Sequence, residues 1–584
     1  MINRATTNIL ILLLIVALTA IAHYSIYYGA LIRGYEASPM SAYRNLALLG
    51  FLAILPLFVS IIFKFKGNWT LYTCAILLFS IGLTIQYRLF TDGEYAVEIP
   101  AEERQKIQNS NMTEKEKARE LNRAKVREIK RERDAKIKTA QLHYIQENYS
   151  PEKKAMMGLP PTPPSPVDLS KEKPRPVEDS LWATITSGKT LIPLFGIFAM
   201  IGVIWLFRRD DVLNWMQSNG FLIVLLTLGP ILLAALTSRA GKTVGNMTPW
   251  ELAKIPFLIG FAAILSVLYK NLAKTYWGIP RAKDVIPLVV MAVLPFISFF
   301  VFKDFGQMMG FSSVYVTLYV VAVRRFSQRF VLVGSVVFLV SVLVVGALPP
   351  STQEKIPLLP TLAAPVKKVL PNRVQERFHL WLDGFSPPSP DTDWWKEDYE
   401  AYYKQLLKQQ PDLEKAIAED ENLKKSINVD AWFNELAYQP AQATFGLVSG
   451  GTTGRGLGLG HVEVISVSDS DYVYSAIGEE LGLFGGILVI FALITFVGAG
   501  VRTALDARDM FSKLCAVGLT AFIGFPALIN IGASTRALPM TGITLPFVSY
   551  GGFSLVTGFI MLGMLLAFSH RNALDRAIEA QAAK

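Results

Sequence analysis

Apolar runs long enough to cross a lipid bilayer recur along most of this chain. A membrane-spanning helix needs about 20 apolar residues, and 52% of the 584 residues here are hydrophobic. Inside a bilayer, backbone polar groups are satisfied only within helices or closed barrels. We therefore predict an all-α polytopic membrane protein with about twelve spans. The predicted spans lie near residues 9–29, 44–63, 70–90, 187–207, 219–238, 251–270, 284–302, 309–324, 328–348, 472–500, 512–533 and 545–569.

Lysine and arginine gather in alternate short loops between these spans. Because short basic loops stay in the cytoplasm, both termini are expected there, and the long segments 91–186 and 349–471 are expected outside. The same bias explains the net charge of +10, and no nucleic-acid-binding motif gives that charge another meaning. The residues that define the bias are Lys64, Lys66, Arg208, Arg209, Lys270, Lys274, Arg281, Lys283, Arg324, Arg325, Arg329, Arg502, Arg508, Lys513 and Arg571.

The two long outer segments differ in composition. Residues 101–148 are dense in charged side chains and predict a solvated helix, while residues 159–177 predict a proline-rich spacer. A solvated stalk is the simpler interpretation of this insertion, and a partner-binding helix is the alternative. Residues 391–420 predict an extra helical hairpin whose aromatic side chains either pack onto the loop or bind a glycan or a partner.

The chain thus divides into five parts. They are three N-terminal membrane helices (1–90), an outer charged and proline-rich insertion (91–186), the middle membrane helices (187–348), a large outer loop (349–471), and the last three membrane helices with a short tail (472–584).

Residues 438–482 concentrate the polar groups of the second half. They begin as a glycine-rich loop, pass two carboxylates at Asp469 and Asp471, and enter an apolar run that carries Glu479. If the helix starts at residue 471, Asp471, Ser475 and Glu479 share one face. Buried carboxylates of this kind usually face a protein interior or a water-filled cavity. The alternative is that Asp471 only caps the helix.

Gln439, Gln442 and three longer blocks resemble the SEDS family. The blocks read SGGTTGRGLGLG (449–460), SDSDYVYSAIGEELG (468–482) and PMTGITLPFVSYGGFS (539–554). SEDS proteins such as FtsW and RodA polymerise lipid-linked peptidoglycan precursors in bacteria. The resemblance implies a ten-helix bundle built from the last ten spans, so the first two helices are an addition.

The resemblance implies an inverting peptidoglycan glycosyltransferase that uses lipid II, with Asp471 at the position of the family's essential aspartate. The family usually reads His-Thr-Asp-Phe where this chain reads Asp469-Ser470-Asp471-Tyr472. A positioned carboxylate can deprotonate the acceptor hydroxyl. Arginine suits the departing diphosphate because its planar fork donates two parallel hydrogen bonds. We expect substrate contacts from Arg377, Gln442, Arg455, Glu479 and Arg536.

A second polar pair lies in GNMTPWELAKIPFLIG (245–260), which resembles another block of the family. Glu251 and Lys254 stand at i,i+3 on a helix and can pair on one face. A charged pair in a membrane helix marks a candidate substrate site, and a structural ion pair between helices is the alternative. Asp304, in FKDFGQMMG, matches a further block and is expected to be structural.

Two other functions remain open from the residues alone. The same polar groups could line a path for transporting the lipid-linked precursor, or the chain could be a non-catalytic scaffold for a transpeptidase. The family resemblance implies a class B penicillin-binding protein as partner. A divalent cation, Mg or Mn, is a possible cofactor, because acids at the outer face would allow one to bridge the diphosphate.

Overall fold

A computed structural model describes many of the membrane helices and most of the C-terminal third of the chain. The described residues are 4–32, 39–91, 105–107, 109, 185–227, 249–272, 274–276, 279–281, 283–290, 305–323, 372–382, 386–392, 395–409, 421–434, 436–462 and 464–582. The predicted span 328–348, most of the insertion 91–186, and Asp304 lie outside these residues.

Helices dominate the described residues, as predicted. The only strands there are β1 (Thr275–Tyr276) and β2 (Ile279–Pro280), which form a short antiparallel pair. The helices are α1 (Arg4–Ile32), α2 (Pro39–Ile62), α3 (Trp69–Thr91), α8 (Gly188–Leu206), α9 (Asp210–Ser218), α11 (Pro249–Leu272), α13 (Phe305–Ala322), α17 (Asn372–Leu382), α18 (Lys396–Gln409), α20 (Glu421–Asn434), α21 (Tyr438–Gly450), α22 (Val473–Leu505), α23 (Met510–Ser534) and α24 (Phe553–Ala582).

Within the described ranges, 8 helices are long and apolar enough to cross a membrane: α1, α2, α3, α8, α11, α22, α23 and α24. This confirms a multi-pass membrane protein. The predicted span at 545–569 begins too early, because α24 starts at Phe553. Residues 545–552 turn instead of continuing a helix, and both Phe547 and Gly552 adopt positive φ angles there.

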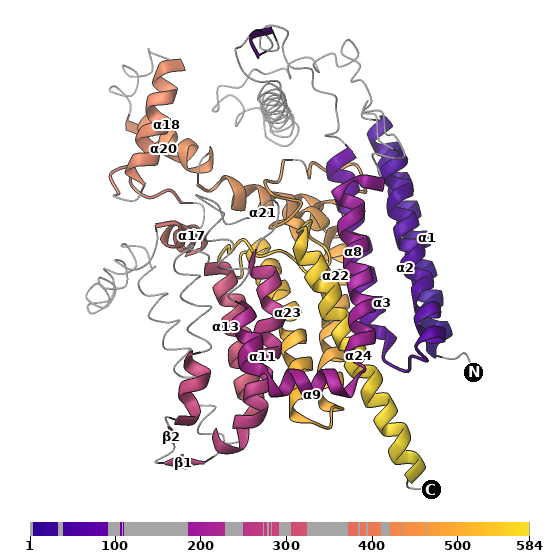
Figure 1. Ribbon diagram of the computed structural model, residues 1–584. Helices are drawn as coiled ribbons and strands as arrows, with labels where there is room; N and C mark the ends of the chain where they lie inside the picture. The colour runs from indigo at the N-terminus through magenta and orange to yellow at the C-terminus, as the bar shows by residue number, and fades with distance from the viewer. Residues whose placement is uncertain are drawn as a thin grey trace.

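The long helices stand side by side in one bundle (Figure 1). α24 packs along α8, α22 packs against α23, and α3 lies against both α1 and α22. Aromatic contacts tie the middle of the bundle together. Phe311 of α13 lies 5.1 Å from Phe257 of α11 and 5.4 Å from Phe522 of α23, measured between ring centroids. Large apolar side chains such as Phe491 and Ile494 of α22 remain exposed, as expected of surfaces that face lipid.

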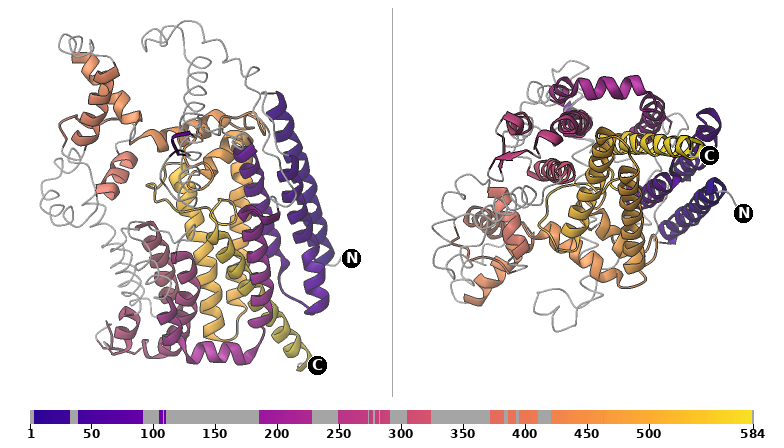
Figure 2. Two further views of the ribbon diagram at one scale, coloured as in Figure 1. Left: turned by 45° about the horizontal axis from the view of Figure 1, so that its top comes forward. Right: turned by 90° about the horizontal axis from the view of Figure 1, so that it is seen from below.

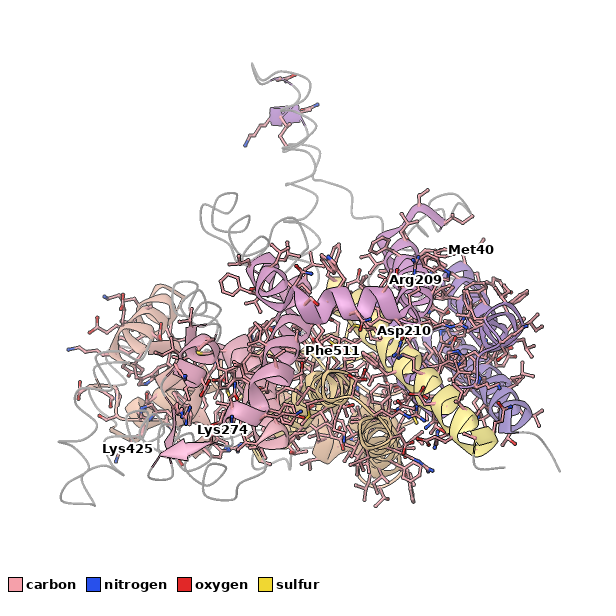
Figure 3. The ribbon with its side chains drawn as sticks, turned by 60° about the horizontal axis from the view of Figure 1, so that its bottom comes forward. Met40, Arg209, Asp210, Lys274, Lys425 and Phe511 are labelled. Carbon is pink, nitrogen blue, oxygen red and sulfur yellow. The ribbon has the colours of Figure 1, made fainter. Side chains whose placement is uncertain are left out.

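The two ends of the bundle carry different parts of the chain. Both termini lie toward the lower end in Figure 1, where α9 runs across the bundle, and α17, α18, α20 and α21 lie at the upper end. The left view of Figure 2 shows the same separation. Arg209 and Lys274 appear on the lower face when it is turned forward (Figure 3). The basic residues Arg209 and Lys274 and the described helices α17, α18, α20 and α21 are therefore at opposite ends, and the membrane side of each end stays a prediction.

In the range 391–420, which was predicted to form a helical hairpin, the structure describes α18, and this helix packs against α20, which begins beyond that range. Trp395 and Trp432 are almost fully buried between these helices, and their rings meet edge to face at 5.2 Å between centroids. The Trp395 indole N–H donates to Asn428 Oδ1 at 2.8 Å. The aromatic side chains thus form a small core of their own, which agrees with the packing interpretation.

Gly82 on α3 lets the helix backbone lie close to Val548 in the loop that precedes α24. A Cβ atom at Gly82 would lie 2.8 Å from the Cα atom of Val548. We predict that Gly82→Ala lowers stability by about 1–3 kcal/mol, because backbone atoms cannot move aside as a flexible side chain can. Thermal unfolding of the detergent-solubilised protein measures this effect. Gly50→Ala on α2 is the matched control, since no atom lies within 4 Å of its added Cβ. Equal losses in the two variants would contradict the prediction.

Candidate active site

Asp471 lies in a tight turn just outside the membrane helix, not on it. α22 begins at Val473 with Tyr472 as its N-cap residue, and no side chain caps this end. The predicted shared face of Asp471, Ser475 and Glu479 is therefore wrong for Asp471, and so is the capping alternative. The turn forms because the backbone N–H groups of Ser470 and Tyr472 both donate to the carbonyl of Val467.

Three consecutive carbonyl groups of this turn are held by the C-terminal part of the chain. The Tyr550 N–H donates to Asp469 O at 2.7 Å. The Ser549 hydroxyl donates to Ser470 O at 2.6 Å, and the Asn530 side-chain amide donates to Asp471 O at 2.8 Å. We call these three hydrogen bonds the carbonyl clamp.

The clamp is itself anchored to the loop that precedes α24. The Ser549 hydroxyl accepts from Leu545 N–H at 2.8 Å, and the Asn530 amide also donates to Ile543 O at 2.7 Å. The sequence reasoning gave no role to Asn530 or Ser549. The only signal for them was their place near or within the third family-like block.

The Asp471 side chain is half-buried and points toward the same loop. A Cβ atom at Gly542 would lie 3.7 Å from Asp471 Oδ2, so this glycine, with φ at 77°, leaves room beside the carboxylate. Burial raises the pKa of Asp471 above its ordinary value, whereas Arg377 lowers it; the Asp469 carboxylate raises it further and a hydrogen bond involving Ser470 lowers it. The net effect is a raised pKa, which makes Asp471 a stronger base than a solvated aspartate.

One predicted arginine, Arg377, acts on this carboxylate, and a second, Arg536, is fastened to the same helix. Arg377 and Trp381 are i,i+4 on α17, and the Trp381 indole N–H donates to the carbonyl of Arg536 at 3.0 Å. The Arg536 guanidinium donates back to Leu380 O at 3.3 Å. α17 is thereby fixed against the turn after α23, and Arg377 lies within electrostatic reach of Asp471.

The two glutamates of α22 hold the glycine-rich loop. α22 is kinked at Gly482, whose φ of 65° and ψ of −162° are not helical. Near the kink, the carbonyls of Glu479 and Glu480 accept the loop N–H groups of Arg455 at 2.8 Å and Gly456 at 3.0 Å. The carboxylates accept further loop N–H groups, Glu479 from His461 at 2.9 Å and Glu480 from Gly458.

Arg88 of α3 binds both Glu480 and the glycine-rich loop. Its guanidinium pairs with Glu480 at 3.1 Å, and both side chains are at most 1% exposed. It also donates to Gly460 O at 2.9 Å. The first helix touches the same loop, because a Cβ atom at Gly29 of α1 would lie 3.1 Å from the carbonyl oxygen of Gly458. Helix α1 thus packs against the glycine-rich loop at Gly458.

The remaining predicted residues occupy different surroundings. The Arg455 side chain is exposed on the glycine-rich loop. Gln442 is half-buried on α21. The sequence predicted a loop for this segment, but it forms a helix. Glu251 and Lys254 pair at 2.6 Å on α11, and Thr557 of α24 donates to the Glu251 carbonyl at 3.2 Å. The ion pair lies within α11, and the backbone carbonyl of Glu251 connects α11 to α24. Neither charged group is among those that shift the pKa of Asp471.

A cleft opens beside the carbonyl clamp. Its volume is about 360 Å³ including its mouth, and it lies between α3, α8 and residues 547–555. Apolar side chains such as Phe79, Leu83 and Ile192 line it, together with Lys189 and Gln86. An apolar cleft with a few polar groups suits an amphipathic ligand.

No group of three or more metal-ligating acids, histidines or cysteines occurs among the described residues. Asp469 and Asp471 nevertheless lie close enough to interact electrostatically. Mg²⁺ is commonly held by one or two carboxylates and completed by phosphate oxygens and water. The turn therefore fits such an ion only together with a phosphorylated substrate.

The buried Arg88–Glu480 pair supports a specific stability prediction. Arg88→Met leaves the Glu480 carboxylate buried without its cation, so we expect a loss of about 3–5 kcal/mol. The double variant Arg88→Met/Glu480→Gln should lose less than the sum of its single variants, because the uncompensated charge is gone. Thermal unfolding of the four proteins gives this coupling. Lys404→Met, in the exposed pair with Glu400, is the control and should cost less than about 1 kcal/mol. Additive losses would contradict the assignment.

The sequence around this site is similar to that of a known protein family. Residues 426–574 match the family model FTSW_RODA_SPOVE, described as a cell cycle protein. RodA of Mycobacterium tuberculosis, named a peptidoglycan glycosyltransferase, is 27% identical over 360 residues, which cover 60% of this chain and 62% of RodA. Stage V sporulation protein E of Bacillus subtilis is 37% identical over 145 residues, which cover 24% of this chain and 40% of that protein. The chain thus spans about three fifths of the length of the mycobacterial RodA proteins that it matches.

Two solved structures are also similar. RodA of Thermus thermophilus is 16% identical, with a TM-score of 0.31 and coverage of 64% of this chain and 95% of that one. A chain from a peptidoglycan synthase complex is 18% identical, with a TM-score of 0.40 and coverage of 67% and 92%. The sequence match at residues 426–574 contains the Asp471 turn, the carbonyl clamp and the glycine-rich loop. Residues 426–574 are therefore similar to the family of FtsW, RodA and stage V sporulation protein E.

Proposed function

We propose that this protein is an inverting peptidoglycan glycosyltransferase that polymerises lipid II. The observation that carries the proposal is a half-buried Asp471 carboxylate, fixed through its backbone by the carbonyl clamp and placed within electrostatic reach of Arg377. The relatives' names support the same activity, since the mycobacterial RodA proteins are called peptidoglycan glycosyltransferases.

In this proposal Asp471 acts as the general base. It takes the proton from the acceptor sugar hydroxyl as the hydroxyl oxygen attacks the anomeric carbon of the donor. The bond from that carbon to the diphosphate breaks, and the diphosphate leaves with the bonding electrons. A direct displacement of this kind inverts the anomeric centre and needs no covalent sugar–enzyme intermediate. The raised pKa of Asp471 favours proton transfer, because a stronger base gains more from the proton.

Positive groups near Asp471 suit the departing diphosphate. Arg377 and Arg536 flank the turn, and the exposed Arg455 lies on the loop held by Glu479 and Glu480. Arginine binds phosphate oxygens through two parallel N–H groups. Mg²⁺ or Mn²⁺, if it binds between the carboxylates of Asp469 and Asp471 and the diphosphate, would supply additional positive charge. The apolar cleft beside Tyr550 suits the first part of a polyprenyl chain.

The other predicted substrate residues have different roles in this proposal. Glu479 acts by holding the loop that carries Arg455, and Gln442 stays a predicted contact. Glu251 and Lys254 pair within α11, and the Glu251 backbone carbonyl accepts a hydrogen bond from Thr557 of α24. Their contact with substrate is a separate proposal.

The proposed reaction takes place at the outer face of the bacterial cytoplasmic membrane, with both termini in the cytoplasm. The positive-inside bias supports this orientation, because α22 begins beside the Asp471 turn and ends beside the basic residues Arg508 and Lys513. A class B penicillin-binding protein is the proposed partner, as the family resemblance implies.

Replacement of the proposed base is the most direct test. Asp471→Asn should reduce polymerisation of purified lipid II at least about 100-fold, because the amide cannot accept the proton. Asp506→Asn, at the opposite end of α22, is the control and should polymerise at the wild-type rate. Full activity of Asp471→Asn would contradict the proposal. A different result would support transport instead: the wild-type protein moves lipid II across vesicle membranes without polymerising it, and Asp471→Asn no longer moves it.

The neighbours of Asp471 predict opposite shifts in the pH dependence of polymerisation. The reaction needs the carboxylate form, so its rate falls as the pH drops through the pKa of Asp471. Asp469→Asn removes a charge that raises this pKa, so the acid limb should move to lower pH. Arg377→Gln removes a charge that lowers it, so the limb should move to higher pH. Rate measurements across pH with the three proteins test both signs, and shifts in the same direction would refute the assignment.

A further inference from the structure

Tyr472 carries a polar group that nothing in the proposed reaction uses. Its side chain is 1% exposed, although it directly follows the proposed base. The ring packs in a small cluster with Ala443 of α21, Ile465 of the turn and Met540 of the last loop. Packing therefore fixes the ring and, with it, the direction of the hydroxyl.

The Tyr472 hydroxyl has no hydrogen-bond partner within the described part of the chain. A buried hydroxyl without a partner is unfavourable, because it has given up its hydrogen bonds to water. Phenylalanine would fill the same packing position without this penalty. The hydroxyl is thus an unused donor in a preorganised position, which is typical of a group that meets its partner only when a ligand binds.

The charged groups around this hydroxyl indicate what the partner is. Three of them lie within electrostatic reach of Tyr472: Asp471, Arg377 and Arg536. The arginines come from two different elements, α17 and the turn after α23, which are fastened to each other by Trp381 and Leu380. Two guanidinium groups on elements that are fastened to each other, together with the neutral Tyr472 O–H donor, form a suitable site for an anion with several oxygen acceptors.

We propose that the Tyr472 hydroxyl donates a hydrogen bond to the diphosphate group of the lipid-linked substrate, which Arg377 and Arg536 hold by charge. This inference rests on the proposed function, and it adds a substrate-contacting residue to it. Asp471 accepts the proton of the acceptor sugar, whereas Tyr472 binds the leaving group and keeps its own proton throughout. Burial raises the pKa of Tyr472, so the hydroxyl stays a donor at every pH at which the enzyme works.

The test compares Tyr472→Phe with the wild-type protein in detergent, by titration with undecaprenyl diphosphate and, separately, with inorganic pyrophosphate. The substitution removes only an unpartnered hydroxyl, so thermal unfolding should be unchanged or slightly raised. Loss of one hydrogen bond to a charged acceptor should weaken binding of both probes about tenfold. The pyrophosphate arm shows whether the diphosphate alone is recognised, without the lipid chain.

Tyr474→Phe is the matched control. Tyr474 is two residues further along and similarly buried, but its hydroxyl lies against Gly486 within α22. This variant should bind both probes as the wild type does. A merely structural role for Tyr472 would lower thermal stability and leave the affinity of the folded protein unchanged.

Several outcomes would overturn the proposal: equal affinities of Tyr472→Phe and wild type for both probes, equal weakening in Tyr474→Phe, or no binding of either probe by the wild type. The result is separable from the proposed function. A wild-type protein that binds undecaprenyl diphosphate through Tyr472 but forms no polymer from lipid II would refute glycosyl transfer and retain the diphosphate contact.

Discussion

The carbonyl clamp is the interaction on which the candidate site depends. Backbone carbonyls withdrawn from water need hydrogen-bond donors within the protein. Here Tyr550, Ser549 and Asn530 supply those donors to residues 469–471. One consequence is that the position of Asp471 is set by residues about 60 to 80 positions later in the chain. Rigid support of this kind lets a carboxylate be half-buried and still point in one direction.

A second set of contacts applies the same principle to the glycine-rich loop. The kink at Gly482 interrupts α22, and loop N–H groups bind the carbonyls of Glu479 and Glu480 just before it. The two carboxylates then become acceptors for further loop N–H groups and for Arg88. Acids that would be costly in a lipid environment are thereby paired. Their pairing also connects α1 and α3 to the loop that carries Arg455.

Some of the site could be predicted from the residues and some could not. Asp471 was identified by its place in a family-like block, and the pairing of Glu251 with Lys254 by helical spacing, which the 2.6 Å contact confirms. The helical start at residue 471 was wrong, because the turn is made by hydrogen bonds to Val467 O and not by local propensity. Residues 438–450 form a helix, although their glycine and polar residues had predicted a loop.

The sequence by itself determined that this is an all-helical, multi-pass membrane protein, because runs of apolar residues at bilayer length have few other solutions. It also determined the chemical candidates, since carboxylates and arginines near a membrane are too costly to be incidental. Only the tertiary structure decided which of them meet. Arg377 and Asp471 are far apart in the chain, and they come together because Trp381 binds the Arg536 carbonyl and Asn530 binds the Asp471 carbonyl. Contacts of this kind depend on the packing of α17, α22 and α23, which no local pattern encodes.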